Sequence, residues 1–428
     1  MSAPLDGPAR APLEARPEPL PPQPPRDAPR GDKALGKVEF VALMAMTSAT
    51  IAFSIDAMLP ALPQIGAALS PDRPNAAQLV IVAFVFGMGL GTLFSGPLSD
   101  ALGRKRVMIG GAVLYSLAAA ACTVAPSLEA LLALRVLQGL GASGPRVVAQ
   151  AMVRDLYAGR GMAQVSSYIM MTFTLVPAIA PLIGAFIIGG FGWRGVFWAF
   201  VLFSVIASTW LLLRQPETLP PALRRPLDVA RLRKAAAEVF ANRAVVRAIA
   251  VQTLVFGALF ATITSVQQTY AITFDREETF PLWFGMVALL SALASLANAS
   301  LVTRLGMPKM IRASLAWHLG LSISLAAAWV AGVLPQGWTF TAFVVWQVST
   351  FAMAGLCIGN LNALAMQPMG HIAGMASSII SAVATILAVC VAAPIGLAFD
   401  GTPVPLFTGV AISAGLALLL ARGLRETA

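Results

Sequence analysis

Charged residues are rare inside the apolar stretches of this sequence, and Asp56 is the carboxylate placed deepest in any of them, with Arg135 at a similar depth in another. A charge near the middle of a bilayer costs at least ~2.5–3.5 kcal/mol on insertion scales, so a residue that bears one is a functional candidate. At about 1.5 Å per helical residue, both are expected roughly 9–14 Å from the outer membrane boundary. We therefore predict an ion pair whose formation switches proton uptake by the carboxyl group. The alternative is a static pair that only fixes helix packing.

The composition is that of a membrane protein. The chain has 428 residues, of which 58% are hydrophobic and 11% charged, whereas a soluble domain has about 25% charged residues. The apolar stretches that are long enough to cross a membrane as helices lie at residues 38–64, 76–98, 107–125, 129–152, 162–190, 195–213, 244–270, 281–303, 311–334, 338–366, 373–399 and 404–421. We predict an all-α membrane protein with twelve transmembrane helices.

Lys and Arg residues are distributed unequally between the two ends of these helices. The formal net charge is +10, and nearly all of the 29 Lys and Arg residues fall within the loops and tails of one side. Of the loop residues, only Arg73, Arg194 and Arg276 fall on the other side. Because positively charged loops stay in the cytoplasm, we predict that both termini are cytoplasmic. The basic charge then indicates no nucleic-acid partner, and the lipid bilayer is the expected surrounding.

The chain divides into two halves of six predicted helices each. A Pro-rich tail at residues 1–36 is predicted to be a disordered cytoplasmic extension, and a shorter tail follows at 422–428. The predicted bundles cover residues 37–213 and 244–421, with a cytoplasmic linker at 214–243. We interpret the two halves as pseudo-symmetric copies.

A cationic turn joins the second and third predicted helices. Residues 96–106 read Gly-Pro-Leu-Ser-Asp-Ala-Leu-Gly-Arg-Lys-Arg, and a degenerate copy at 299–309 lies between the eighth and ninth helices. This turn resembles the signature of the major facilitator superfamily, which implies that superfamily's fold. Three further stretches resemble the bicyclomycin/chloramphenicol-type multidrug efflux proteins of bacteria, at residues 56–63, 135–144 with 154–155, and 366–377. The resemblance implies a multi-pass protein of the bacterial inner (cytoplasmic) membrane.

The resemblance also assigns a cytoplasmic gate to the turn, formed by Gly96, Asp100, Gly103, Arg104, Arg106 and Asp155. It implies that Asp100 faces the start of the eleventh helix near Ala373, where free backbone amides favour a carboxylate. It further implies that Arg104 reaches Asp155. The alternative is that the cations only orient the protein, which explains Lys105 and Arg106 but not Asp100.

The fifth helix departs from the drug-antiporter pattern. Those proteins often carry Gly-Pro-x-x-Gly-Gly, whereas this chain has Ala-Pro-Leu-Ile-Gly-Ala at 180–185. Pro177, Pro181 and Gly184 form a helix-kink motif that preserves bending and close packing.

A substrate cavity is expected among polar, aromatic and Met residues of the helices that line the central path of this fold. Such a mixture suits varied hydrophobic solutes, although ordinary helix packing is the alternative for each residue. The candidates are Phe53, Met58, Arg146, Met171, Phe173, Gln252, Phe256, Gln267, Gln268, Tyr270, Trp346, Gln347, Asn360 and Asn362. For Arg146, which shares a helix face with Arg135, the alternative is a side chain that reaches toward lipid headgroups.

These observations favour a secondary active transporter that exports hydrophobic or amphipathic drugs in exchange for protons, and so contributes to antibiotic resistance. It would act as a monomer, with no cofactor and no metal, and with the proton gradient as its energy source. A proton-coupled carrier of metabolites with the same fold is the alternative. A membrane-embedded enzyme is disfavoured, because the two histidines and the single deep carboxylate form no catalytic cluster.

Overall fold

A computed structural model describes residues 35–424, apart from the side chains of residues 172–174, 295, 296, 299 and 300. Within this range the chain forms helices joined by turns, and no strand. The predicted tail at 1–36 lies outside the described residues except for its last two, as do the final four residues of the predicted tail at 422–428.

The first half contains six long helices in five segments. They are α1 (Lys37–Asp56), α3 (Leu79–Leu102), α4 (Arg104–Cys122), α5 (Leu128–Leu156) and α6 (Gly159–Arg214). The last of these is two helices that meet at Gly192, whose φ of 66° lies in the left-handed region that glycine adopts readily. The predicted first span is also interrupted, because α1 ends at Asp56. A short 3-10 turn (Leu59–Ala61) and α2 (Leu62–Leu69) then follow.

The second half also contains six long helices. They are α8 (Arg243–Gln268), α9 (Phe280–Leu305), α10 (Met307–Val330), α11 (Gln336–Met366), α12 (Ala373–Leu397) and α13 (Val404–Ala421). A π-helical turn, Thr269–Thr273, extends α8. Between the halves, the predicted linker contains one further helix, α7 (Val229–Ala241), which begins at the N-cap Asp228.

Within residues 35–424, eight helical stretches are long and apolar enough to cross a membrane. Two of them each hold two helices: Gly159–Arg214 is α6, and Gln336–Leu397 joins α11 to α12. The remaining two of the twelve long helices are α5, which carries several charges, and α9, whose apolar part Phe280–Ala294 is shorter. The fold is therefore an all-α membrane fold with twelve transmembrane helices, as the sequence predicts.

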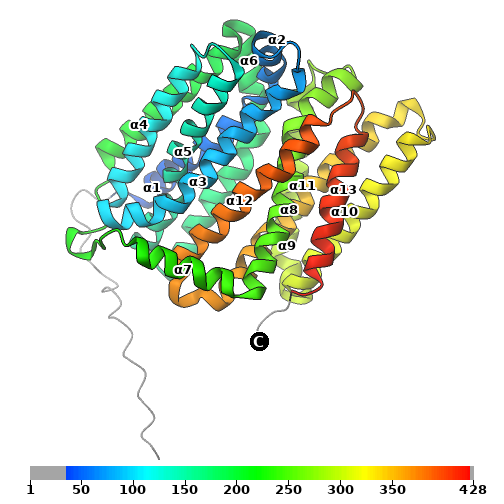
Figure 1. Ribbon diagram of the computed structural model, residues 1–428. Coiled ribbons are helices and arrows are strands. Elements are labelled where there is room, and N and C mark those ends of the chain that lie inside the picture. The colour runs from blue at the N-terminus through cyan, green and yellow to red at the C-terminus, as the bar shows by residue number, and fades with distance from the viewer. Residues whose placement is uncertain (1–34, 425–428) are drawn as a thin grey trace, which may run out of the picture. The chain divides into compact units, whose positions relative to one another are not determined.

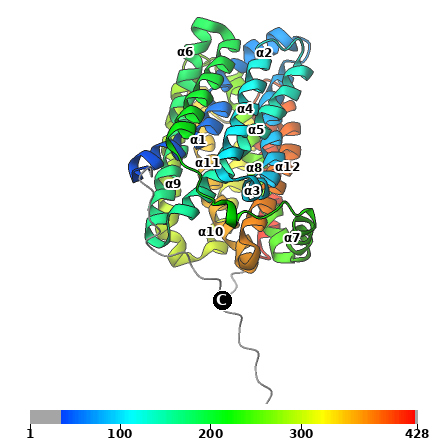
Figure 2. The same cartoon turned by 90° about the vertical axis from the view of Figure 1, so that its left-hand side faces the viewer.

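The halves meet along two helix pairs, α3 with α12 and α6 with α9. Figures 1 and 2 both show α3 and α12 side by side. Glycines allow this close approach, since a Cβ added to Gly89 would lie 2.8 Å from Ile386 of α12. On the other seam, a Cβ added to Gly285 of α9 would lie 2.5 Å from the Ala178 carbonyl oxygen of α6. Backbones thus pack directly on each other between the halves.

The two ends of the helix bundle differ in charge. The end that carries Arg104–Arg106, α7, the start of α1 and the end of α13 is called the basic end below (Figure 1). The opposite end, which carries α2 and the π-helical turn, is called the far end.

Candidate functional site

The turn at residues 96–106, called the gate turn below, reverses the chain at a glycine. Helix α3 ends at Leu102 and α4 begins at Arg104, and Gly103 between them has a φ of 103°. Such a backbone conformation strains any residue with a Cβ. Gly103 also leaves room for a linker carboxylate, because an added Cβ would lie 2.5 Å from Glu217 Oε2.

Arg104 is the centre of the gate turn. Its side chain is almost wholly buried. Nε donates to Asp155 Oδ2 at 3.1 Å, and Nη1 donates to Ser99 Oγ at 2.7 Å and to Asp100. The contact between Arg104 and Asp155 is therefore present as expected. It ties the gate turn to the end of α5, within the first half.

Asp100 makes no hydrogen bond or ion pair with the start of α12 among the described residues. Its carboxylate pairs with Arg104, four residues later, and its backbone carbonyl accepts a hydrogen bond from Arg225 N at 3.0 Å. Arg104 pairs with the Asp100 carboxylate because the turn folds Arg104 back over the last turn of α3. Helix α3 instead meets α12 earlier, where a Cβ on Gly96 would lie 3.1 Å from Ser378 Oγ.

The linker covers the gate turn, a feature that the sequence analysis missed. Glu217 Oε1 accepts from Arg104 N at 2.9 Å, and Oε2 accepts from Lys105 N at 3.2 Å, so this carboxylate caps the start of α4. Thr218 Oγ1 donates to Asp155 Oδ2 at 2.9 Å. A signal was available in the sequence, because an acid directly after the sixth helix must emerge at the same end as the gate turn.

Helix α7 continues the linker onto the second half. It packs against α12 and α8 at the basic end, as Figures 1 and 2 both show for α12. Glu238 of α7 pairs with His371 Nε2, in the turn before α12, at 2.5 Å. The linker therefore touches the gate turn of one half and the helix ends of the other.

Arg135 is fully buried and bonded to neutral groups. Nε donates to the Val80 carbonyl at 3.1 Å, Nη2 to the Ser54 carbonyl at 3.1 Å and Nη1 to Gln138 Oε1 at 2.7 Å. The guanidinium also lies 4.4 Å from the ring centroid of Phe84. Arg135 thus joins α1, α3 and α5 through carbonyl dipoles and an aromatic ring.

The predicted ion pair between Asp56 and Arg135 is absent. Asp56 is 4% exposed and has no hydrogen bond or ion pair with any residue of the described range 35–424. The reason is helical geometry: Ser54 faces Arg135, and Asp56, two residues later, is turned by about 200° to the opposite side of α1. Counting residues gives depth in the membrane, but it does not give the direction in which a side chain points.

The helix-kink motif positions α6 against the end of α1. Pro177 and Pro181 lie inside α6, as the sequence suggests. A Cβ added to Gly184 would lie 2.2 Å from the carbonyl oxygen of Ala57, the residue after Asp56. Gly184 therefore sets the distance between α6 and the chain segment that carries Asp56.

The predicted cavity residues do not gather in one place. Phe53 packs on Phe200 and Phe203 inside the first half. Tyr270 and Trp346 belong to an aromatic cluster inside the second half, around Phe343. Large aromatic side chains fill the core of each half because that position buries most of their surface.

The remaining cavity candidates divide between exposed, buried and undescribed positions. Met171 is 64% exposed, and Met58 is fully buried. Phe256 stacks on Phe260, the half-buried Arg146 has no partner within the described range, and the side chain of Phe173 lies outside it.

Amide side chains of the second half keep unused hydrogen-bonding capacity. Gln252 Nε2 donates to Asn362 Oδ1 at 3.3 Å, and Asn360 Nδ2 donates to Asn298 Oδ1 at 2.9 Å. Gln347 Oε1 accepts from Tyr270 at 2.9 Å. The second polar atom of two of these amides, Gln252 Oε1 and Gln347 Nε2, is buried without a protein partner in the described chain.

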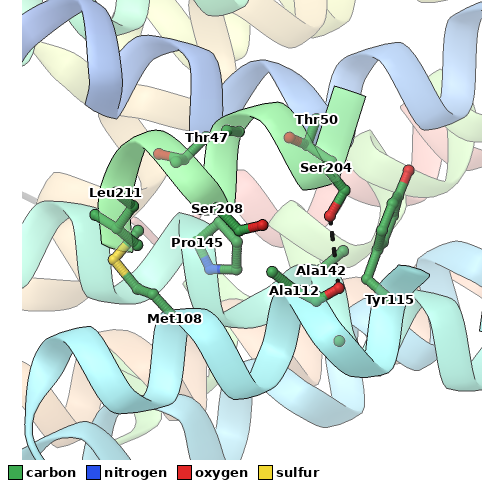
Figure 3. Close-up of a pocket in the computed structure, with 12 residues that line it drawn as sticks. Thr47, Thr50, Met108, Ala112, Tyr115, Ala142, Pro145, Ser204, Ser208 and Leu211 are labelled. Carbon is green, nitrogen blue, oxygen red and sulfur yellow. Dashed lines mark hydrogen bonds between the residues drawn. The ribbon is translucent and has the colours of Figure 1, made fainter. Parts of the chain in front are cut away.

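A small hollow lies inside the first half, between α1, α4, α5 and α6, with a mostly apolar lining (Figure 3). Thr47, Thr50, Tyr115, Ser204 and Ser208 line it, and its volume of about 20 Å³ suits a single water molecule. The sequence analysis did not find it, because these hydroxyl groups come from three different helices.

The halves are tied at the far end by uncharged groups, called the amide clasp below. Gln78 Nε2 donates to Gln268 Oε1 at 2.7 Å, and Gln268 Nε2 donates to Asn75 Oδ1 at 2.7 Å. Ser265 donates to Gln78 Oε1 at 3.1 Å, and Gln78 also donates to the Gly396 carbonyl of α12 at 3.1 Å. Gln268, which was predicted in a cavity, bonds across the halves in this clasp and also lines a groove beside it.

A twelve-helix membrane fold in two halves, with glycine-lined seams between them, defines the class of alternating-access transporters. Residues 42–394 match the family model of the Major Facilitator Superfamily, so the chain belongs to that family. It is a multi-pass membrane transporter of small molecules and not an enzyme.

Similar proteins agree with this assignment. The chain is 28% identical to the bicyclomycin resistance protein homolog of Haemophilus influenzae, over 80% of this chain and 85% of that protein. It is 39% identical to a chloramphenicol resistance protein of Pseudomonas aeruginosa, over 38% and 39% of the two chains. Among solved structures, a D-xylose-proton symporter superposes with a TM-score of 0.72 at 13% identity, over 90% of this chain and 98% of that one.

Proposed function

We propose that this transporter exports hydrophobic or amphipathic compounds, including antibiotics, in exchange for protons. The observation that carries the proposal is Asp56, a buried carboxyl group without a partner in the described chain. A lone acid can take up and release a proton without breaking an ion pair. A charged acid in an apolar environment costs free energy, so an acid that is kept there is a candidate for the coupling site.

The position of Asp56 supports this role. It ends α1, and the next residue, Ala57, is in close contact with Gly184 of α6. Helix α6 in turn packs along α9 of the other half at Gly285. A change in the charge of Asp56 would therefore act next to one of the two seams along which the halves move.

The two ends of the bundle support an alternating-access cycle. At the far end the amide clasp joins the halves directly. At the basic end Arg104 binds Asp155 within the first half, and Asp100 makes no hydrogen bond or ion pair with α12 among residues 35–424. We propose that this arrangement is closed at the far end, and that Gly96, Asp100, Gly103, Arg104, Arg106 and Asp155 act as the gate at the basic end.

Charge supports an orientation with the basic end in the cytoplasm. The gate turn, the linker and the loop between α9 and α10 carry Lys and Arg residues, and such loops stay on the cytoplasmic side. Both termini and the linker at 214–243 would then be cytoplasmic, and the far end would face the periplasm of a bacterial inner membrane.

The choice of drugs as substrates is supported by the relatives, which are named for bicyclomycin and chloramphenicol resistance. A sugar or organic acid carrier is less well supported. The two charged side chains inside predicted helices that have no partner in the described chain, Asp56 and Arg146, lie in the first half, whereas the second half offers amides such as Gln252 and Gln347.

The decisive experiment replaces Asp56 by Asn. We expect the variant to fold and reach the membrane but to lose efflux of ethidium and chloramphenicol driven by a pH gradient, because Asn cannot bind a proton. Accumulation of both compounds would be measured in cells with and without an uncoupler. The matched control is Asp72→Asn, an exposed acid at the far end, which should transport like the wild type. Wild-type efflux by Asp56→Asn would refute proton coupling at this residue.

A further inference from the structure

A groove opens between the two halves at the far end, beside the amide clasp. The first half lines it with α2 and the turn before α3, and the second half lines it with α8 and the π-helical turn. Its volume is about 490 Å³, which lies within the roughly 300–1,000 Å³ of small-molecule sites. The sequence analysis assigned nothing to this groove as a whole, although it named Gln267 and Gln268.

One buried amide in the groove lacks a partner. Gln267 is 2% exposed, lines the groove, and makes no hydrogen bond to any residue of the described chain. Its neighbour Gln268 bonds within the clasp through both Oε1 and Nε2, as does Gln78. Because no described protein group occupies the amide of Gln267, a ligand in the groove can bond to it without breaking a bond of the clasp.

The charge at the groove favours a cation. Glu277 lines it and is exposed, and none of the ion pairs among the described residues includes this carboxylate. The neighbouring cations are engaged elsewhere, since Arg73 pairs with Glu129 at 3.5 Å and Arg276 lies 4.5 Å from the ring centroid of Phe340. No Lys or Arg lines the groove.

The walls of the groove are apolar and come from both halves. Leu62, Pro63 and Pro74 lie on one side, and Ala271 and Ile272 on the other. A ligand that fills the groove must therefore have an apolar body, and it must touch both halves at once.

We infer that this far-end groove is a binding site for amphipathic organic cations, which Gln267 and Glu277 hold by their polar group. A ligand that bridges the halves stabilises the closed far end by mass action. The role of the site in transport rests on the export function proposed above, under which the groove faces the side to which the compound is exported. Exported compound that binds again in the groove slows the next opening of the far end. The rate of efflux therefore falls as the exported compound accumulates outside.

The test measures binding of tetraphenylphosphonium to the purified full-length protein by isothermal titration calorimetry. Glu277→Gln and Gln267→Leu should each weaken binding roughly tenfold, which corresponds to about 1.4 kcal/mol. The matched control is Glu278→Gln, the adjacent exposed acid that does not line the groove, and it should bind like the wild type. Gln267→Glu should bind more tightly than the wild type, a gain that misfolding does not produce.

Two outcomes overturn the inference: equal binding by wild type, Glu277→Gln and Gln267→Glu, or loss of binding in Asp56→Asn, which would place the probe in the central path. The binding assay needs no proton gradient. A failure of the proposed export function therefore appears as wild-type efflux by Asp56→Asn, independently of the result for the groove.

Discussion

Glu217 offers a quantitative test of the linker as part of the gate. Its two carboxylate oxygens accept from three backbone amides, Arg104 N at 2.9 Å, Lys105 N at 3.2 Å and Leu219 N at 3.1 Å. Loss of a capping side chain costs roughly 0.5–2 kcal/mol, and loss of a negative charge at a helix N-terminus roughly 0.3–1 kcal/mol. Glu217→Ala should therefore destabilise the gate turn by about 1–3 kcal/mol.

Hydrogen exchange read by mass spectrometry is the direct assay. A local cost of about 1–3 kcal/mol corresponds to a loss of protection of roughly 5- to 150-fold at the amides of Arg104 and Lys105. Glu217→Gln keeps one oxygen acceptor and should lie between wild type and Glu217→Ala. Transport turnover should fall in the same order, because the gate turn loses its fixed position.

The control variant lies in the same linker. Asp228 caps α7 through a bond from Arg231 N at 3.0 Å, away from the gate turn. Asp228→Ala should expose the start of α7 to exchange and leave Arg104 protected. Unchanged protection of Arg104 in Glu217→Ala would refute the reasoning, because the three bonds would then contribute nothing to the order of the turn.

Two further predictions concern packing and the far-end closure. Gly139→Ala should lower thermal stability sharply, because the added Cβ would lie 2.0 Å from the Phe84 carbonyl oxygen. The control is Gly110→Ala, whose added Cβ would meet no atom within 4 Å, and it should be neutral or stabilising. Equal unfolding temperatures for the two variants would contradict this packing. Gln78→Leu removes three bonds between the halves. A cysteine introduced at Thr264 should then react faster with an impermeant maleimide. Unchanged labelling would exclude the clasp as a closure.

The helices and their order were predictable from the sequence, because the length and hydropathy of a membrane helix follow from bilayer thickness. The contact of Arg104 with Asp155 was also predicted, through the family signature. The predicted partner of Asp56 was wrong, since one residue of a helix changes a side chain's direction by about 100°. Both sides of α1 are apolar around Asp56 and Ser54, so hydropathy contains no signal for that direction.

The cavity candidates and the contacts of the linker show a second limit of prediction from the sequence. Phe53 and Trp346 have the composition expected of a drug pocket, but the same residue types also fill a helix-bundle core, and in each half the core contains them. Glu217 could not be assigned from periodicity, because its contacts depend on how an irregular segment folds back over a turn. Gln267 was predicted as a cavity residue, and it does line the groove at the far end.

The two ends of the helix bundle are held by different kinds of bond. The amide clasp consists of amides, a hydroxyl group and backbone carbonyls, and none of these groups carries a net charge. At the basic end Arg104 forms an ion pair with Asp155, and His371 bonds to Glu238. Dissolved salt screens ion pairs but hardly affects bonds between neutral groups. The bonds of the amide clasp therefore depend little on salt concentration, whereas the ion pairs at the two ends, Arg104 with Asp155 and Arg73 with Glu129, weaken as salt is added.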